Sequence, residues 1–352
     1  MKNMTSPHIR RIVASSMAGI VLASALAGGG AAFADEASPG GAADGPATET
    51  AATATVERIG GADRYEVSAA ISARTFDPDV PVMYIASGAV YSDALSASAA
   101  AGAFGGGVLL VEQDAIPPVI TDELTRLRPQ QIVVMGGETT VSRSVEVALR
   151  AYSSTVTRVG GADRYEVSAA VSGRTFGTAR PVAFIASGAV FSDALSASAA
   201  AGHLGGPVLL TDKSVVPPSI LSELNRLNPA RIVVLGGATT VSDAVVTRLG
   251  TIAPTTRIKG ADRFEVSATT SLKSFTARTG APVYVASGTV FADALSGGAA
   301  AIASGSPVLL VEKDVLPPSV ATEIQRLDPS RIIVLGGTNS VSAGVAAALG
   351  RL

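Results

Sequence analysis

The chain of 352 residues contains no cysteine, no tryptophan and only two histidines, His8 and His203. The lack of cysteine excludes disulfide bonds, thiolate metal sites and a cysteine nucleophile. A catalytic zinc site needs several His, Asp, Glu or Cys ligands, and a Ser-His-Asp triad needs a suitably placed histidine. Two related segments carry Ala103 and Ala303 where a third carries His203, so we expect His203 to be a surface residue. A glycosidase with paired carboxylates is harder to exclude, because acidic residues are plentiful.

An excess of charge of either sign is also missing. Lys and Arg number 27 and Asp and Glu number 29, which gives a formal net charge of −2. This balance argues against a broad basic surface, so we expect no nucleic-acid partner. The sequence has neither a G-x-x-x-x-G-K-[ST] loop nor a correctly placed G-x-G-x-x-G, and we expect no cofactor and no metal.

The N-terminal residues form a pattern typical of exported proteins. Lys2, Arg10 and Arg11 precede an apolar stretch that ends in Ala-Phe-Ala, so 1–34 is predicted to be a signal peptide cleaved after Ala34. A retained membrane anchor is the alternative, which Ser and Gly within the short apolar stretch disfavour. Later hydrophobic runs are only strand-length, so we expect no membrane span in the mature chain. Residues 35–55, rich in Ala, Gly, Pro, Thr and acid, are predicted to be a flexible linker.

The rest of the chain consists of one unit written three times. RIGGADRYEVSAAISARTF at 58–76 returns at 158–176 with 16 of 19 positions identical, and again from Arg257 in a more divergent form. We place the units at 56–154 (repeat 1), 155–253 (repeat 2) and 254–352 (repeat 3). A unit of this length can bury its own core. Since no polar linker separates the units, we expect them to pack on one another.

Each repeat alternates apolar runs with helical patterns. In repeat 1 the expected strands are 55–59, 82–87, 108–111 and 131–136, and the expected helices are 63–76, 93–104, 117–127 and 141–152. Continuous Val, Ile and Leu runs are typical of strands covered on both faces. The sequence therefore predicts an α/β fold in which every repeat is a small layered domain with a parallel sheet of about four strands.

Ligand sites of parallel α/β sheets gather at the carboxyl ends of the strands. In repeat 1 four loops are expected there, at 60–64, 86–93, 111–118 and 136–142, each leading into a helix N-terminus that favours anions. The arginines beside the first loop can bind a phosphate or a carboxylate. Asp63 and Asp93 are well placed to cap helices, which is the role that we favour for them. A ligand role is compatible with capping, and for Asp93, Asp193 and Asp293 both roles stay open. The candidate ligand-binding residues are Arg64, Arg164, Arg263, Ser87, Ser187, Ser287, Asp93, Asp193 and Asp293.

The string IASGAVYSDALSASAAAG at 85–102 returns at 185–202 with one difference and at 285–302 with several. Together with the R-[IV]-x-G-x-D-R-[YF] segments and the I-[IV]-V-[ML]-G-G segments, it resembles the cell wall binding repeat 2 family over the whole chain after the linker. The Ala/Ser/Gly face of SASAAAG is suited to close packing, and our hypothesis is that this packing joins the units.

The resemblance implies three Rossmann-like repeats packed with pseudo-threefold symmetry. It also implies a secreted, cell wall associated, non-catalytic protein of Gram-positive bacteria. The expected partner is an anionic secondary wall polymer or a peptidoglycan-linked polysaccharide. The alternative is a peptidoglycan hydrolase or an activator of a wall amidase. The family's P-[IV]-L-L segment, which in repeat 1 has Gly107 in place of the proline, adds ligand candidates at Leu109, Leu110, Leu209, Leu210, Leu309 and Leu310.

Overall fold

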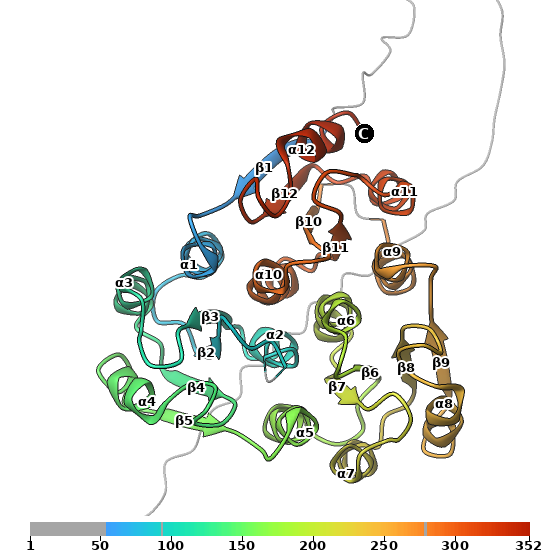
Figure 1. Cartoon of the computed structure of the whole chain (residues 1–352), viewed down its shortest axis with the longest axis horizontal. Coiled ribbons are helices and arrows are strands. Elements are labelled where there is room, and N and C mark those ends of the chain that lie inside the picture. Colours follow the sequence, from blue (N-terminus) through green and yellow to red (C-terminus); the bar gives the residue numbers. More distant parts are fainter. Residues whose placement is uncertain (1–53, 93, 278–279) are drawn as a thin grey trace, which may run out of the picture. The chain divides into compact units, whose positions relative to one another are not determined.

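The computed structural model describes residues 54–92, 94–277 and 280–352, and Figure 1 shows the course of the chain. The predicted signal peptide, its cleavage site at Ala34 and nearly all of the predicted linker lie outside the described residues, as does Asp93.

Twelve strands and twelve helices are found in the described residues. The strands are β1 (Thr55–Ile59), β2 (Val82–Ser87), β3 (Gly107–Val111), β4 (Gln131–Met135), β5 (Val156–Val159), β6 (Ala183–Ser187), β7 (Val208–Thr211), β8 (Ile232–Leu235), β9 (Thr255–Ile258), β10 (Pro282–Ser287), β11 (Val308–Val311) and β12 (Arg331–Leu335). The helices are α1 (Arg64–Thr75), α2 (Ala97–Ala103), α3 (Pro118–Leu127), α4 (Arg143–Leu149), α5 (Arg164–Thr175), α6 (Phe191–His203), α7 (Pro218–Leu227), α8 (Asp243–Gly250), α9 (Arg263–Ser274), α10 (Phe291–Ala303), α11 (Pro318–Leu327) and α12 (Ala343–Leu349).

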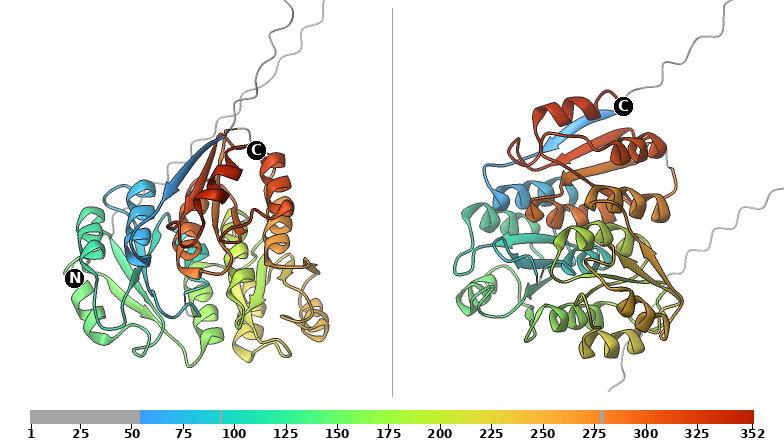
Figure 2. Two further views of the ribbon diagram at one scale, coloured as in Figure 1. Left: turned by 45° about the horizontal axis from the view of Figure 1, so that its top comes forward. Right: turned by 45° about the vertical axis from the view of Figure 1, so that its right-hand side comes forward.

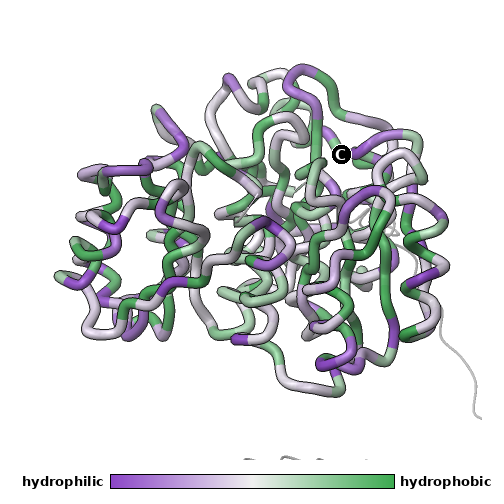
Figure 3. The backbone as a smooth tube through the Cα atoms, turned by 60° about the horizontal axis from the view of Figure 1, so that its bottom comes forward, coloured by the Kyte–Doolittle hydropathy of each residue, from purple (hydrophilic) through white to green (hydrophobic). Residues whose placement is uncertain are grey.

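The strands form three parallel four-stranded sheets, which confirms the predicted α/β class. Their strand orders are β3-β2-β4-β5, β7-β6-β8-β9 and β1-β12-β10-β11. The two central strands of each sheet and the strand at its inner edge are almost entirely buried apolar residues, as expected for a sheet covered on both faces. In Figure 3, hydrophilic colour marks several outer turns and hydrophobic stretches run between them.

One strand of every sheet comes from the following repeat. The expectation that each repeat supplies all four strands of its own sheet is therefore wrong for that strand. β5 completes the sheet of repeat 1 and β9 completes that of repeat 2. β1, the first strand of the described residues, lies beside β12, the last one, and so closes the ring (Figure 2). The apolar period of a strand predicts that it is a strand but not which sheet it joins.

Helices α2, α6 and α10 lie together at the centre of the pseudo-threefold arrangement (Figure 1). The Ser98 hydroxyl donates to the Leu295 carbonyl at 2.5 Å across two repeats. A Cβ added to Gly298 would come within 3.0 Å of the Ser98 Cβ and 3.5 Å of the Ser198 Cβ. Such close backbone approach requires small side chains, so the hypothesis that the SASAAAG face joins the units is supported by these contacts.

Helices α1, α5 and α9 begin as the sequence predicts. The Asp63 carboxylate accepts hydrogen bonds from the backbone N–H groups of Tyr65 and Glu66, at 2.8 and 2.9 Å. The Glu66 carboxylate accepts one from the Ala62 N–H at 2.7 Å. The pattern differs from a capping box in that Glu66 accepts from Ala62, the residue before the Asp63 cap, and not from Asp63 itself. Together these bonds fix where the helix starts after the GGAD turn.

Candidate functional site

The three candidate arginines lie where neighbouring repeats meet. Each is the first residue of its helix, and the helix follows a strand that belongs to the preceding repeat's sheet. Arg64 donates to the Gly88 carbonyl and Arg164 to the Gly188 carbonyl. Arg263 donates to the Gly288 carbonyl at 2.7 Å. The same guanidinium-to-loop bond therefore recurs at all three junctions, at the carboxyl ends of the strands.

Asp193 and Asp293 are not helix caps, which corrects one of the two roles left open by the sequence. α6 and α10 begin two residues earlier, and their cap positions are Val190 and Val290, which make no side-chain cap bond. Both carboxyl groups are buried in the first helical turn. Each reaches the glycine pair that follows the fourth strand of its repeat, where Thr240 bonds Asp193 and Ser340 bonds Asp293.

No residue with a side chain fits at Gly336, in the turn that Asp293 reaches. Gly336 has φ of +92°, a left-handed conformation that L-residues rarely adopt. A Cβ there would overlap the Asp293 Oδ2 atom. Asp293 Oδ2 itself is buried without a hydrogen-bond partner among the described residues. The carboxyl group is therefore held by backbone shape and by a single hydroxyl.

Burial raises the pKa of Asp193 to about 6, although the neighbouring Arg263 and the bond from Thr240 oppose the shift. Burial also raises the pKa of Asp293, against the opposing effects of the Ser340 bond and of Arg64. In both cases desolvation of the charged form is the main cause. Each aspartate thus faces the arginine of the following repeat, and the two groups form a junction site whose charge depends on pH.

An aromatic cluster joins the three repeats, with Tyr91 in the loop before α2 and with Phe191 and Phe291 as the first residues of α6 and α10. The rings of Tyr91, Phe191 and Phe291 lie 5.4, 5.5 and 6.1 Å apart between centroids. The Arg64 guanidinium lies 5.7 Å from the centre of the Phe291 ring, within cation–π range. Sequence reasoning missed these half-buried rings. The signal was present, because an aromatic residue recurs at one position of the repeated string.

The serine candidates shape the loops that carry this site. The Ser87 hydroxyl accepts hydrogen bonds from the N–H groups of Ala89 and Val90, at 3.1 and 3.2 Å. Ser187 accepts one from Ala189 at 3.1 Å, and Ser287 accepts two in the same pattern as Ser87. All three side chains are buried, so their hydroxyls act on the backbone of the loop.

The six leucine candidates have no exposed surface. Leu109, Leu110, Leu209, Leu210, Leu309 and Leu310 are all 0% exposed, within β3, β7 and β11. A ligand outside the protein cannot reach these side chains. Any contribution of the segment to binding acts through the strand that it builds, which presents the loop after it.

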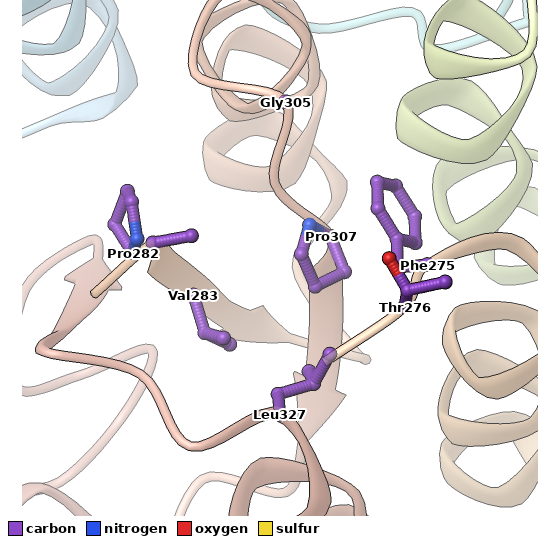
Figure 4. A pocket seen from close by; sticks show the side chains of 8 residues that line it. Phe275, Thr276, Pro282, Val283, Gly305, Pro307 and Leu327 are labelled. Atoms are coloured by element: carbon purple, nitrogen blue, oxygen red, sulfur yellow. The ribbon is translucent and has the colours of Figure 1, made fainter. Parts of the chain in front are cut away.

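Two further features of the described residues are His203 and a small apolar depression. His203 is exposed and stacks on Phe275, 4.6 Å between ring centres, as expected for a surface residue. Figure 4 shows an apolar depression near Pro307 and Leu327, whose volume of about 10 Å³ has room for roughly one water molecule. Among the described residues no group of three or more His, Cys, Asp or Glu is arranged to hold a metal ion.

The repeats match the model of one protein family, "Cell wall binding domain 2 (CWB2)", at residues 58–146, 158–246 and 257–346. The chain belongs to the CWB2 family. The family match supports cell wall binding as the general function of the chain, and with it association with the cell wall. No helix in the described residues has both the length and the apolar character of a membrane span.

Two curated relatives of this CWB2 protein come from Bacillus subtilis strain 168. An "Amidase enhancer" is 27% identical over 292 residues, which are 83% of this chain and 40% of the relative. "N-acetylmuramoyl-L-alanine amidase LytC" is 26% identical over 291 residues, which are 83% of this chain and 57% of the relative. The chain thus spans about half the length of these relatives.

Two solved structures from Clostridium difficile share the CWB2 protein's fold. Cwp6 superposes with a TM-score of 0.78 at 25% identity, over 84% of this chain and 48% of that one. Cwp8 superposes with a TM-score of 0.76 at 24% identity, over 85% of this chain and 52% of that one. The likeness supports three tandem α/β repeats as the architecture.

Proposed function

We propose that the protein is secreted and attaches non-covalently to the Gram-positive cell wall, without catalysis, by binding an anionic secondary wall polymer. The observation that carries the proposal is the repeated arginine at every junction of repeats. Arg64, Arg164 and Arg263 start their helices at the same edge of the ring and keep the same bond to the neighbouring loop. Three equivalent cationic points suit a polymer whose negative charges repeat.

The physical reason is the combination of weak sites. One guanidinium at a surface that water and salt reach contributes little to binding, and of the three arginines Arg64 is exposed while Arg164 and Arg263 are half-buried. Three such sites on one chain act together, because after the first contact the others bind at high effective concentration. The N-termini of α6 and α10 at this edge add a favourable dipole for anions. Threefold copying of a loop is better suited to such avidity than to catalysis at one centre.

The test is sedimentation of the purified protein with isolated cell walls. We expect the protein to sediment with intact walls and to stay in solution with walls from which anionic polymer has been removed by acid. The triple variant Arg64→Gln, Arg164→Gln, Arg263→Gln should lose sedimentation while keeping its circular dichroism spectrum. A matched triple variant, Arg150→Gln, Arg248→Gln, Arg351→Gln, removes the same charge from exposed positions elsewhere and should still sediment. Equal sedimentation of both variants would contradict the proposal.

The printed names of the two Bacillus relatives favour a second candidate, a wall hydrolase or an activator of an amidase. Release of dye from labelled walls separates it from the first. Release of dye by the pure protein indicates a hydrolase, and faster release when the protein is added to a wall amidase indicates an activator. If the protein is non-catalytic and does not activate an amidase, the pure protein releases no dye and the rate of the amidase is unchanged.

A further inference from the structure

A second charged feature lies at the opposite edge of the sheets, where repeats 2 and 3 meet. A cavity of about 220 Å³ opens there between the sheet of repeat 2 and helix α9. Arg231 immediately precedes β8 and Lys273 lies in the last turn of α9, so both are at the amino-terminal edge of the strands. Thr256 of β9 lines the cavity with them. The cavity is therefore separate from the arginines at the carboxyl ends.

The junction of repeats 3 and 1 shows what belongs between such cations. Glu57 of β1 occupies the position that Thr256 takes in repeat 3. Its carboxylate lies 2.9 Å from Arg74 and 3.9 Å from Arg331, the counterparts of Lys273 and Arg231. An internal carboxylate thus bridges the two cations at one junction. At the other junction the cations remain and the carboxylate is replaced by a threonine.

The third junction, between repeats 1 and 2, has one cation fewer. Gln131 stands in place of Arg231, and Arg174 donates to the Thr157 hydroxyl at 2.9 Å. Only the cavity between repeats 2 and 3 combines two cations with no acid among the described residues that surround it. None of the ion pairs found between described residues includes Arg231 or Lys273, and both side chains are exposed. Arg257, which also lines the cavity, is already bonded to Asp243.

The other walls of the cavity are apolar. Phe184, Leu204 and Val233 line it. Phe184 replaces the tyrosine found at this position in repeats 1 and 3, and Tyr84 there lies with its hydroxyl 3.5 Å from the Thr175 hydroxyl. The site therefore has a cationic end and a hydrocarbon wall. Its volume far exceeds the roughly 10–15 Å³ that one water needs.

We propose that this cavity binds a small aliphatic carboxylate. The carboxylate lies between Arg231 and Lys273, where Glu57 lies in the equivalent junction, and the hydrocarbon part contacts Phe184, Leu204 and Val233. A charged hydrogen-bonded carboxylate is recognised more strongly than a neutral group of the same shape, because both partners are cationic donors. This proposal does not depend on wall-polymer binding, and its test can succeed or fail whatever the sedimentation experiment shows.

The probe is isovalerate, with isovaleramide as the neutral ligand of the same shape. Calorimetric titration of the purified protein at millimolar ligand should show binding of isovalerate, with isovaleramide weaker by about tenfold or more. Absence of isovalerate binding, or equal binding of the amide, would overturn the proposal.

Variants taken from the chain's own repeats locate the site. Thr256→Glu places a carboxylate where Glu57 has one and should abolish isovalerate binding while raising the melting temperature. Arg231→Gln copies Gln131 of repeat 1, which folds with that residue, and should weaken isovalerate binding by about tenfold. Thr157→Glu makes the same change at the junction without the second cation and should leave binding as in the wild type. Unchanged binding in Arg231→Gln, or loss in Thr157→Glu, would refute the assignment.

Discussion

The three junctions between repeats use the same pairing of strands but differ in how the chain reaches it. Val156 pairs with Ile132, Thr255 with Ile232 and Val56 with Ile332, all in parallel register. β5 and β9 each follow directly from the repeat whose sheet they complete. β1 comes from the opposite end of the chain. The first two junctions are therefore covalent, and the third is closed only by contacts.

A difference in charge accompanies the difference in connectivity. The arginine in the added strand donates to the glycine carbonyl of the preceding repeat at every junction: Arg58 to Gly336, Arg158 to Gly136 and Arg257 to Gly236. Arg158 also pairs with Glu146 and Arg257 with Asp243. Arg58 bonds only to carbonyl oxygens among the described residues, and burial lowers its pKa. At the junction that closes the ring, this arginine thus lacks the carboxylate partner that Arg158 and Arg257 have.

Removal of β1 should have the largest effect. A protein that begins at Gly60 leaves the β12 edge and part of its apolar face unpaired, and we expect a loss comparable to the whole 5–15 kcal/mol of a typical domain. Urea unfolding followed by circular dichroism measures it. A protein that begins at residue 54 is the control and should unfold like the full chain.

A rearranged chain sharpens this comparison. Ser-Ser followed by Thr-Val-Glu-Arg-Ile, attached after Leu352 of the protein that begins at Gly60, copies the connection from α4 to β5. We expect it to restore cooperative unfolding, because a covalent neighbour replaces a distant one and closing the shorter loop costs less entropy. If the truncated protein is already as stable as the full chain, β1 does not hold the ring together.

The contacts at the central axis rank second. Gly298→Leu would drive a side chain into Ser98 and Ser198 of the other two repeats. Overpacking of this kind costs about 1–3 kcal/mol or more in unfolding free energy. Gly250→Leu is the matched control, since a Cβ there meets nothing within 4 Å. Equal urea midpoints for the two variants would show that the axis tolerates larger residues.

The pH dependence of stability should be the third effect. The raised pKa of Asp193, about 6, means that the folded state holds a proton which the unfolded chain releases near its ordinary pKa of 3.8. Unfolding free energy should therefore increase by about 1 kcal/mol between about pH 7 and about pH 5, as protonation removes the cost of burying the charge. Asp193→Asn should lose this increase. If the variant and the wild type change equally with pH, Asp193 does not titrate in this range.

The smallest effect is expected from a substitution that gives Arg58 the kind of carboxylate partner that its counterparts have at the other two junctions. Ala346 occupies the position in α12 that Glu146 occupies in α4. Ala346→Glu should give Arg58 the carboxylate partner that Arg158 has and raise the unfolding free energy by about 0.5–1 kcal/mol. Thermal unfolding at low and high salt measures the gain, which salt should reduce. A decrease in stability would show that the helix cannot place the new carboxylate near Arg58.

The sequence was sufficient for the features set by local chemistry. Runs such as VMYIAS predict buried strands because covered parallel strands are apolar throughout, and Asp63 with Glu66 predicts a helix start because the spacing satisfies free N–H groups. Asp193 could not be placed in this way. Its position depends on the turn at Gly236, more than forty residues later in the sequence. The exchange of strands depends on which edge is free, and no short segment encodes that.

Ile302 of α10 makes the packing of the three central helices asymmetric, because α2 and α6 have glycine at the equivalent position. A Cβ on Gly102 or on Gly202 would meet the Ile302 side chain, so one isoleucine fills the space left by two glycines. In the string that contains these glycines, repeats 1 and 2 differ at one position of 18, whereas repeat 3 differs from them at several. In a ring with two copies of repeat 3, two isoleucine side chains would compete for the space beside one glycine. In a ring without repeat 3, the space beside the glycines would have no isoleucine to fill it. The axis therefore fixes the composition of the ring, with one unit of one kind and two of another.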